Sequence, residues 1–343
     1  MRVSLCHVQN VDESLATYAL QLGVTSINIT TPELPAPRGY WMTDDIAALR
    51  KKCESLGLRL EGIENTAHDM YDQVMVGGPR RDQQLENYQQ TIRSVAAAGV
   101  PVLGFHFMPT AVWRTDLTAP GRGGAEVTAY DHQKSDAGNK VIWPADEGAA
   151  RLSADAIWAN YEYFLDAVLP VADEVGLLLA HHPDDPPVEE IRGFARVFNT
   201  PENLVRAMGL AKGSTAWGLT ACLGTISEME GGARAVSEVI EYFGSRGKIR
   251  YVHMRDVQGT VPMFQECFIN EGNYSPAAVI KRLDELDFDG WIQDDHVPGM
   301  SEDTSFGHRA RAHAIGYMQG IIESLESSSI ARAHAEPDRV GAP

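Results

Sequence analysis

Short apolar runs alternate with amphipathic segments eight times along this chain. Runs of this length, separated by apolar residues at helical spacing, are typical of buried parallel strands that alternate with helices. The pattern predicts a single (β/α)8 TIM barrel, an α/β fold, occupying residues 1–326. The predicted strands are Val3–Val8, Ser26–Thr30, Leu58–Ile63, Val102–Phe107 and the runs that begin at Gly176, Ala216, Ile249 and Gly290.

Helix starts are marked by hydroxyl side chains between these runs. Thr43 is expected to cap a helix that carries Cys53 on its apolar face. Thr200 and Ser275 each precede a proline, a pair that is favoured where a helix begins.

Two segments depart from the alternation. Residues 108–144, after the fourth strand, are rich in Gly, Thr and Asp and have no period, which predicts a long loop that acts as a lid on the active-site face. Residues 327–343 are small and polar and predict a disordered tail.

The composition is that of a globular enzyme: 343 residues, 44% hydrophobic and 22% charged, with no apolar run long enough to cross a bilayer. No secretory signal is evident at the first residues, so the cytoplasm is the expected compartment. A formal charge of −18 argues against nucleic acid or an anionic membrane as a partner, because both require basic surfaces. A homo-oligomer is expected.

Four residues able to bind a divalent metal follow the last four apolar runs. They are separated by 40, 31 and 42 residues, about one strand-plus-helix unit each. Parallel barrel strands all end at one face, so these side chains are expected to meet there. One thiolate, two imidazoles and one carboxylate suit Zn²⁺, Fe²⁺, Co²⁺ or Mn²⁺. The four residues are His182, Cys222, His253 and Asp295.

Other polar residues near the predicted strand ends are candidates for substrate contacts. Arg114, in the long loop, is expected to bind a carboxylate through its planar guanidinium, with an ordinary surface arginine as the equal alternative. His181, next to a predicted ligand, points to the other side of an ideal strand and is interpreted as a packing residue. The remaining candidates are His7, Glu64, His68, His106 and Arg255.

The most distinctive motif places two prolines after two carboxylates, directly behind a predicted ligand: His182-Pro183-Asp184-Asp185-Pro186-Pro187. It resembles the signature of the mannonate dehydratase family, xylose-isomerase-like barrel enzymes that convert D-mannonate to 2-keto-3-deoxy-D-gluconate. Further resemblance lies in Glu86-Asn-Tyr-Gln-Gln-Thr-Ile-Arg, Trp113-Arg-Thr-Asp-Leu, Tyr251-Val-His-Met-Arg-Asp-Val, Phe264-Gln-Glu and Asp295-His296. The resemblance implies that the same four residues are the metal ligands, that the ion is Mn²⁺, and that His296 is a catalytic acid or base.

The chain departs from the family pattern around the substrate. The family's Arg-Pro-Asp-His reads Gln293-Asp294-Asp295-His296 here, and both tyrosines of the family's Gly-Tyr-Gly-Leu-Tyr-Asp-Arg-Ala segment are replaced, by Phe306 and Arg309. Neither can act as a phenolic acid, although Arg309 remains a candidate substrate contact. His308, between them, is the candidate to replace the phenol.

These departures leave three readings. The first is a Mn²⁺-dependent dehydratase acting on mannonate or a related sugar acid. The second is a metal-dependent isomerase, epimerase or lyase acting on a related or aryl-substituted carbohydrate, since a metal-stabilised enediolate serves several outcomes. The third, a binding protein that has lost catalysis, is the minor alternative.

Overall fold

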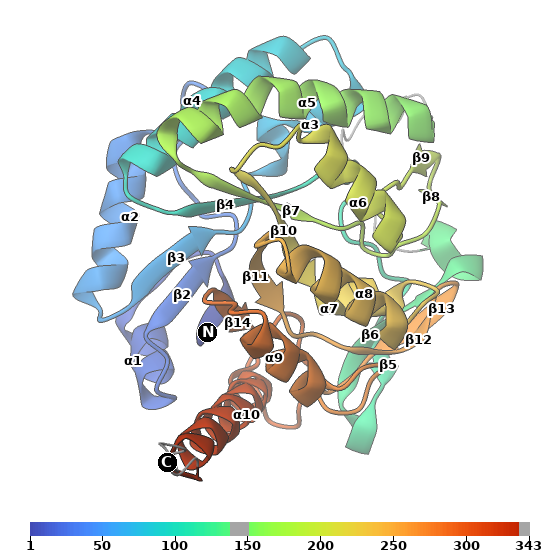
Figure 1. Cartoon of the computed structure of the whole chain (residues 1–343). Helices are drawn as coiled ribbons and strands as arrows, with labels where there is room; N and C mark the ends of the chain where they lie inside the picture. The colour runs from blue at the N-terminus through green and yellow to red at the C-terminus, as the bar shows by residue number, and fades with distance from the viewer. Residues whose placement is uncertain (138–150, 336–343) are drawn as a thin grey trace, which may run out of the picture.

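The computed structural model describes residues 1–137 and 151–335. Within these residues eight parallel strands close into a barrel, in the order β1-β14-β11-β10-β7-β4-β3-β2, with helices around it (Figure 1). The predicted fold and all eight predicted strands are confirmed. The barrel strands are β1 (Arg2–Val8), β2 (Ser26–Ile29), β3 (Arg59–Ile63), β4 (Val102–His106), β7 (Leu178–His182), β10 (Trp217–Cys222), β11 (Ile249–His253) and β14 (Trp291–Gln293).

The helices bury one face each against the barrel, and two of the three predicted caps are confirmed. The hydroxyl of Thr200 accepts a hydrogen bond from Asn203 N, and that of Ser275 from Ala278 N. The third is wrong: Thr43 is the first helical residue, and Met42 precedes it without a side-chain cap. The described helices are α1 (Glu13–Gln21), α2 (Thr43–Ser55), α3 (Asp72–Val76), α4 (Arg81–Ala97), α5 (Ala154–Val175), α6 (Pro201–Leu210), α7 (Leu223–Glu228), α8 (Ala233–Gly244), α9 (Pro276–Glu285) and α10 (His308–Ala335).

The segment after β4 is more ordered than its sequence suggests. It holds the antiparallel strands β5 (Asp116–Pro120) and β6 (Glu126–Asp131), and β6 pairs with a second hairpin, β12 (Val257–Thr260) and β13 (Met263–Glu266). The four strands form a sheet beside the barrel (Figure 1). Because β6 is held by a hairpin more than 130 residues away, its local pattern could not reveal it. Residues 138–144 of the predicted lid lie outside the described residues.

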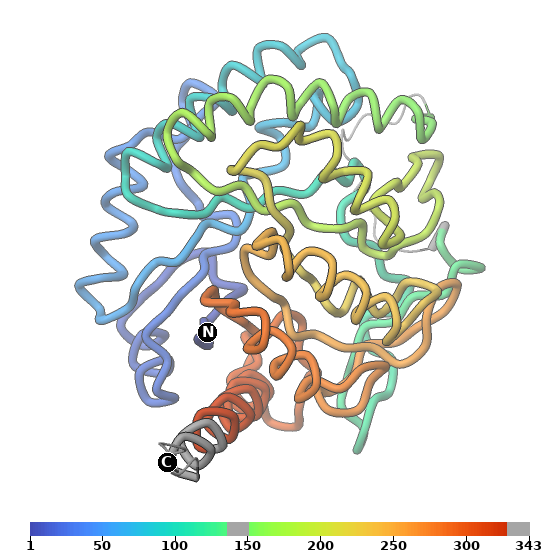
Figure 2. The backbone as a smooth tube through the Cα atoms, viewed as in Figure 1, coloured from blue at the N-terminus to red at the C-terminus, as the bar shows by residue number. Residues whose placement is uncertain are grey.

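The predicted tail begins too early. Helix α10 continues to Ala335, so only residues 336–343 of the segment lie beyond it, outside the described residues. The polar appearance of this stretch concealed several good helix formers among its alanines and arginines. Figure 2 shows α10 leaving the barrel beside the start of the chain, where Gln319 donates a hydrogen bond to the Leu22 carbonyl. Among the described helices, none is both long and apolar enough to cross a membrane.

Candidate active site

The four predicted metal ligands lie together at the carboxyl ends of the last four barrel strands. His182, Cys222 and His253 end β7, β10 and β11, and one donor atom from each lies within 4.8 Å of the others. Asp295 follows β14, and its Oδ2 is 3.6 Å from Cys222 Sγ and 3.7 Å from His253 Nδ1. Convergence in space therefore follows from equivalent positions on neighbouring strands, as the spacing predicted.

The hydrogen bonding around these residues leaves metal-binding atoms free. Neither ring nitrogen of His253 has a hydrogen-bond partner in the described part of the chain, although both are buried. His182 Nδ1 donates to the Pro183 carbonyl at 2.7 Å, which leaves the Nε2 lone pair available. A histidine that binds metal through one nitrogen commonly donates from the other in this way. The residues fit a divalent cation.

Charge favours a cation at the same place. Burial raises the pKa of the Cys222 thiol, but the Arg255 guanidinium and the His182 imidazole outweigh it and lower the pKa to about 5. Burial lowers the pKa of His253, but the negative charges of Asp295 and Glu64 raise it to about 10. The site therefore holds a thiolate and carboxylates that suit a metal ion, and an ion that binds there displaces the proton of His253.

Arg114 does not face a substrate. Its guanidinium is buried and forms a bidentate pair with Asp185 of the double-proline motif, and it lies 2.9 Å from Glu266 and 3.4 Å from Glu228. Arg114 therefore binds carboxylates, as predicted, but they belong to the protein itself. The alternative, an ordinary surface arginine, is wrong because the side chain is buried. The sequence could not show this, since the partners are 71 to 152 residues away.

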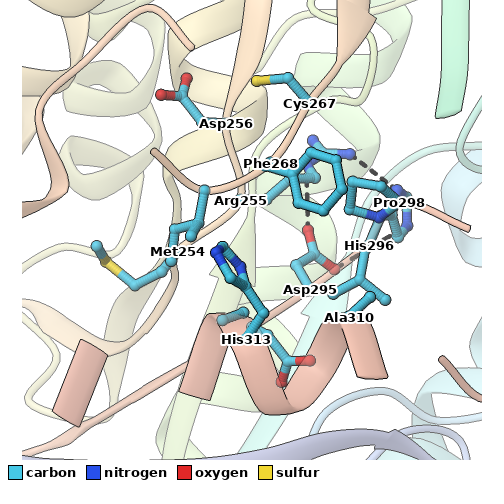
Figure 3. A pocket seen from close by; sticks show the side chains of 14 residues that line it. Met254, Arg255, Asp256, Cys267, Phe268, Asp295, His296, Pro298, Ala310 and His313 are labelled. Atoms are coloured by element: carbon cyan, nitrogen blue, oxygen red, sulfur yellow. Dashed lines mark hydrogen bonds and ion pairs between the residues drawn. The ribbon is translucent and has the colours of Figure 1, made fainter. Parts of the chain in front are cut away.

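Arg255 joins this cluster to the metal ligands. It contacts the same three carboxylates, at 2.8 Å from Asp185 and Glu266 and 3.0 Å from Glu228, and its Nε lies 3.3 Å from Asp295 Oδ2. Figure 3 shows Arg255, Asp295 and His296 turned toward one another. Arg255 therefore links the buried carboxylates to Asp295 and orients the Asp295 carboxylate.

His296 and His7 lie on the open side of Asp295. His296 Nδ1 is 2.7 Å from Glu266 Oε1, and its Nε2 is 4.0 Å from Asp295 Oδ1. His7 Nε2 is 2.6 Å from that same Oδ1. The side chains of His7 and His296 are 27% and 30% exposed, so a ligand entering from solvent can reach both.

Three further candidates come from the first half of the barrel and lie near the four predicted metal ligands. Glu64 Oε1 is 3.4 Å from His253 Nε2. His106 is paired in register with His182, and its ring centroid is 5.2 Å from that of His68. Burial lowers the pKa of His68 to about 4 and that of His106 well below its usual value, so both rings are neutral near pH 7. These residues lie at or just after the ends of β3 and β4, on strands other than those of the four predicted ligands.

His308 and Arg309 are not at the site. His308 lies at the surface, where its Nδ1 is within hydrogen-bonding distance of Thr304 Oγ1 and its ring packs edge-on against Tyr18. Arg309 is exposed and donates a hydrogen bond to the Ser301 carbonyl. The helix begins at His308 itself, which lies at its solvent-exposed end. In the same helix, Arg311 is buried and donates to Asp294 Oδ2 and the Asp295 carbonyl.

Sequence reasoning missed the acids that order the site. Asp185, Glu228 and Glu266 are all buried and bind both arginines, yet only the first belongs to a motif that looked unusual. The usable signal was a carboxylate directly beside an apolar run, as at Glu266 before Cys267-Phe268-Ile269. Packing of His181 was predicted correctly: its ring is stacked on Phe105, and its Nδ1 lies 3.1 Å from the Tyr161 hydroxyl.

Two cavities adjoin this region. The one behind Asp295, toward α10, has a volume of about 10 Å³, which admits a single water at most. Figure 3 shows Phe268, Pro298 and His313 filling its walls. A larger cavity of about 430 Å³ is lined by the segments after β1, β2 and β3, including Gln9 and Trp41. This larger cavity follows the ends of β1, β2 and β3, and none of its lining residues is a predicted metal ligand.

Comparison with known proteins agrees with this geometry. The family model described as D-mannonate dehydratase (UxuA) matches residues 8–143 and 147–332. Mannonate dehydratase 2 of Halalkalibacterium halodurans is 31% identical and covers 84% of this chain and 89% of its own length. The mannonate dehydratase of Geobacillus thermodenitrificans is also 31% identical, with 84% of each chain covered.

Solved structures give the same picture. A mannonate dehydratase from Streptococcus suis serotype 2 superposes with a TM-score of 0.83 at 29% identity, over 98% of this chain and 97% of its own. D-Psicose 3-epimerase from Clostridium cellulolyticum H10 superposes with a TM-score of 0.58 at 12% identity, over 94% of this chain and 99% of its own. The second likeness concerns the barrel fold alone.

Proposed function

The chain belongs to the D-mannonate dehydratase family of hydro-lyases, and from that membership we propose that it removes water from D-mannonate to give 2-keto-3-deoxy-D-gluconate. We propose Mn²⁺ as its metal. The observation that carries the proposal is the group of three donor side chains at the ends of β7, β10 and β11, with Asp295 after β14 lying 3.6 Å from Cys222 Sγ and 3.7 Å from His253 Nδ1. The ligands in this proposal are His182, Cys222, His253 and Asp295.

A metal bound there acts as a Lewis acid on the substrate carboxylate and stabilises the negative charge that develops when the carbon next to it loses its proton. The protein's own groups must then carry the protons. His296 stands beside Asp295 with its Nδ1 held by Glu266, which fixes the ring and directs Nε2 toward the open side. That arrangement suits an acid or base that touches the substrate.

The surrounding residues hold this arrangement in place. Arg255 and Arg114 neutralise the buried acids, so that Glu266 is fixed where His296 needs it. Glu64, His68 and His106 lie at or just after the ends of β3 and β4, where hydroxyl groups of a sugar acid have polar partners. The lid role expected for the segment from residue 108 stays a prediction, since its described part is a sheet bound to β13.

Turnover of defined sugar acids tests the proposal. Chelator-treated protein is reloaded with Mn²⁺ and incubated with D-mannonate and its C2 and C3 epimers, and the products are identified by mass and NMR. We expect a 2-keto-3-deoxy acid from D-mannonate, one water lighter than the substrate, and no product from metal-free protein. Failure with every acid would contradict the proposal, and a product of unchanged mass would identify an isomerase or epimerase.

A further inference from the structure

Elimination of water needs two proton transfers, and the structure supplies a second imidazole next to His296. A base takes the proton from the carbon beside the carboxylate, and an acid protonates the departing hydroxyl on the next carbon. His308, the residue expected to join His296, lies at the surface against Tyr18. Within the described residues, His7 is the histidine whose ring faces His296, with ring centroids 5.4 Å apart.

The backbone places His7 at the mouth of the barrel. It stands next to the last residue of β1, and its φ of 55° lies in the left-handed region that a side chain of this kind rarely adopts. Such conformations are retained where the surrounding structure requires a side chain to point in a particular direction. Strand β1 pairs with β14, which delivers Asp295, so the two side chains meet across neighbouring strands.

The two imidazoles are held in the same manner. One nitrogen of each lies within hydrogen-bonding distance of a carboxylate, His296 Nδ1 at 2.7 Å from Glu266 and His7 Nε2 at 2.6 Å from Asp295. The other nitrogen of each ring is left for a ligand, and both side chains are partly open to solvent. His7 and His296 therefore lie on either side of one position next to Asp295, where both free ring nitrogens can contact a bound substrate.

We propose that His7 is the second catalytic residue and shares the two proton transfers with His296. In the step, the C2–H bond breaks and its proton goes to one imidazole, while the electron pair enters the enediolate. The C3–O bond then breaks, and the hydroxyl leaves as water with a proton from the other imidazole. The resulting enol becomes the keto acid, and proton exchange with solvent restores both rings. This inference rests on the proposed dehydratase function.

The same atoms could instead bind a second metal ion, and the experiment must distinguish that role from proton transfer. His7, Asp295 and His296 each offer a donor atom within 4.8 Å of the others, as a second metal site would. Counting bound metal therefore accompanies every rate measurement.

The test compares His7→Gln with His296→Gln, using His308→Gln as the matched control at a surface histidine. Each full-length protein is loaded with Mn²⁺, its metal content is measured, and kcat and KM for D-mannonate are determined. Exchange of the C2 hydrogen in D₂O is followed by NMR in parallel. Loss of an acid–base group costs about 100-fold or more in rate.

We expect kcat of His7→Gln to fall by at least about 100-fold, with KM within a few-fold of the wild type and one Mn²⁺ per chain in each variant. One of the two site variants should keep C2 exchange while losing elimination, and the other should lose both. The inference is overturned if His7→Gln keeps wild-type kcat, if it loses one metal equivalent, or if exchange falls equally in both variants. Inactive wild-type protein would instead contradict the proposed function.

Discussion

Two neighbouring clusters of largely buried polar residues differ in how fully their hydrogen bonding is satisfied. The ligand cluster is His182, Cys222, His253 and Asp295, and the arginine–carboxylate cluster is Arg114, Arg255, Asp185, Glu228 and Glu266. In the ligand cluster, both ring nitrogens of His253 lack a partner among the described residues. In the arginine–carboxylate cluster, the Arg255 guanidinium contacts three carboxylates at 3.0 Å or less, and only single atoms of a side chain, Arg255 Nε and Glu228 Oε2, lack a hydrogen-bond partner among the described residues. Buried polar groups are normally paired, so a ring with neither nitrogen paired marks a place for a ligand, whereas the multiply paired arginines are framework.

Asp295 joins the two clusters. Its Oδ2 faces Cys222, His253 and Arg255, and its Oδ1 faces His7. The framework can therefore fix a ligand atom without occupying the metal position itself. Substitutions in the two clusters should have different effects, on metal content and activity in one case and on folding in the other.

The largest effect is expected from Cys222→Ser. A serine hydroxyl stays protonated near pH 7 and cannot supply the thiolate charge, so metal content should fall well below one ion per chain. Activity should fall roughly 1000-fold, which corresponds to the loss of about 4 kcal/mol of metal-derived stabilisation. Elemental analysis and steady-state kinetics measure the two quantities.

Cys53→Ser is the matched control, because Cys53 is buried in α2 among core side chains. It should lower the free energy of unfolding and leave the metal content unchanged. A Cys222→Ser protein that keeps a full equivalent of metal would show that the ligand cluster is not the metal site.

The next effect is expected from Asp185→Asn, in the arginine–carboxylate cluster. This change removes the bidentate carboxylate partner of Arg114 and one of the two carboxylates that lie 2.8 Å from Arg255, all of them buried. Removing one member of a buried ion-pair network costs about 3 kcal/mol or more. Urea unfolding of the metal-free protein measures it and keeps metal binding out of the comparison.

The control is Asp166→Asn, which removes the carboxylate from an exposed pair with Lys212. An exposed pair contributes about 0.5 kcal/mol. Equal losses in the two variants would mean that the arginine cluster is not a structural unit, and the contrast between the clusters would fail.

How far the sequence predicts this molecule depends on how local the responsible interactions are. The ligand positions could be predicted because each follows a strand, and the barrel brings strand ends together whatever the loops do. The arginine–carboxylate cluster could not, since Arg114 reaches Asp185 and Glu266 across 71 and 152 residues. Nothing in the local pattern around Arg114 specifies those partners.

The wrong prediction that His308 lies at the site has a different cause. Which residues of α10 face the barrel depends on where the helix begins, and Gly307, with a φ of +79°, starts it one residue before His308. A shift of one or two residues in the start of a helix changes the face on which a given side chain lies. The inward arginine is therefore Arg311, and His308 faces Tyr18.

The smallest predicted effect concerns two neighbours on one strand, His181 and His182, which point to opposite sides of β7. Burial lowers the pKa of His181 well below its usual value, and the ring is packed between Phe105 and Phe198. In the unfolded chain this imidazole takes up a proton as the pH falls through about 6.5, whereas the folded protein excludes it. The free energy of unfolding should therefore decrease on acidification, by up to about 1.4 kcal/mol per pH unit for this residue.

His181→Gln should reduce that slope between pH 6.5 and pH 5, although the cavity it creates lowers stability at every pH. Part of the slope should remain, because burial also lowers the pKa of His68 and of His106. His308→Gln is the control for the substitution itself at a surface position. Urea unfolding at several pH values measures all three proteins, and an unaltered slope in His181→Gln would mean that the folded protein admits the proton. In that case burial alone would not separate a packing histidine from a predicted ligand, and the remaining difference would be that both ring nitrogens of His253 lack a hydrogen-bond partner among the described residues, whereas His181 lacks one only at Nε2.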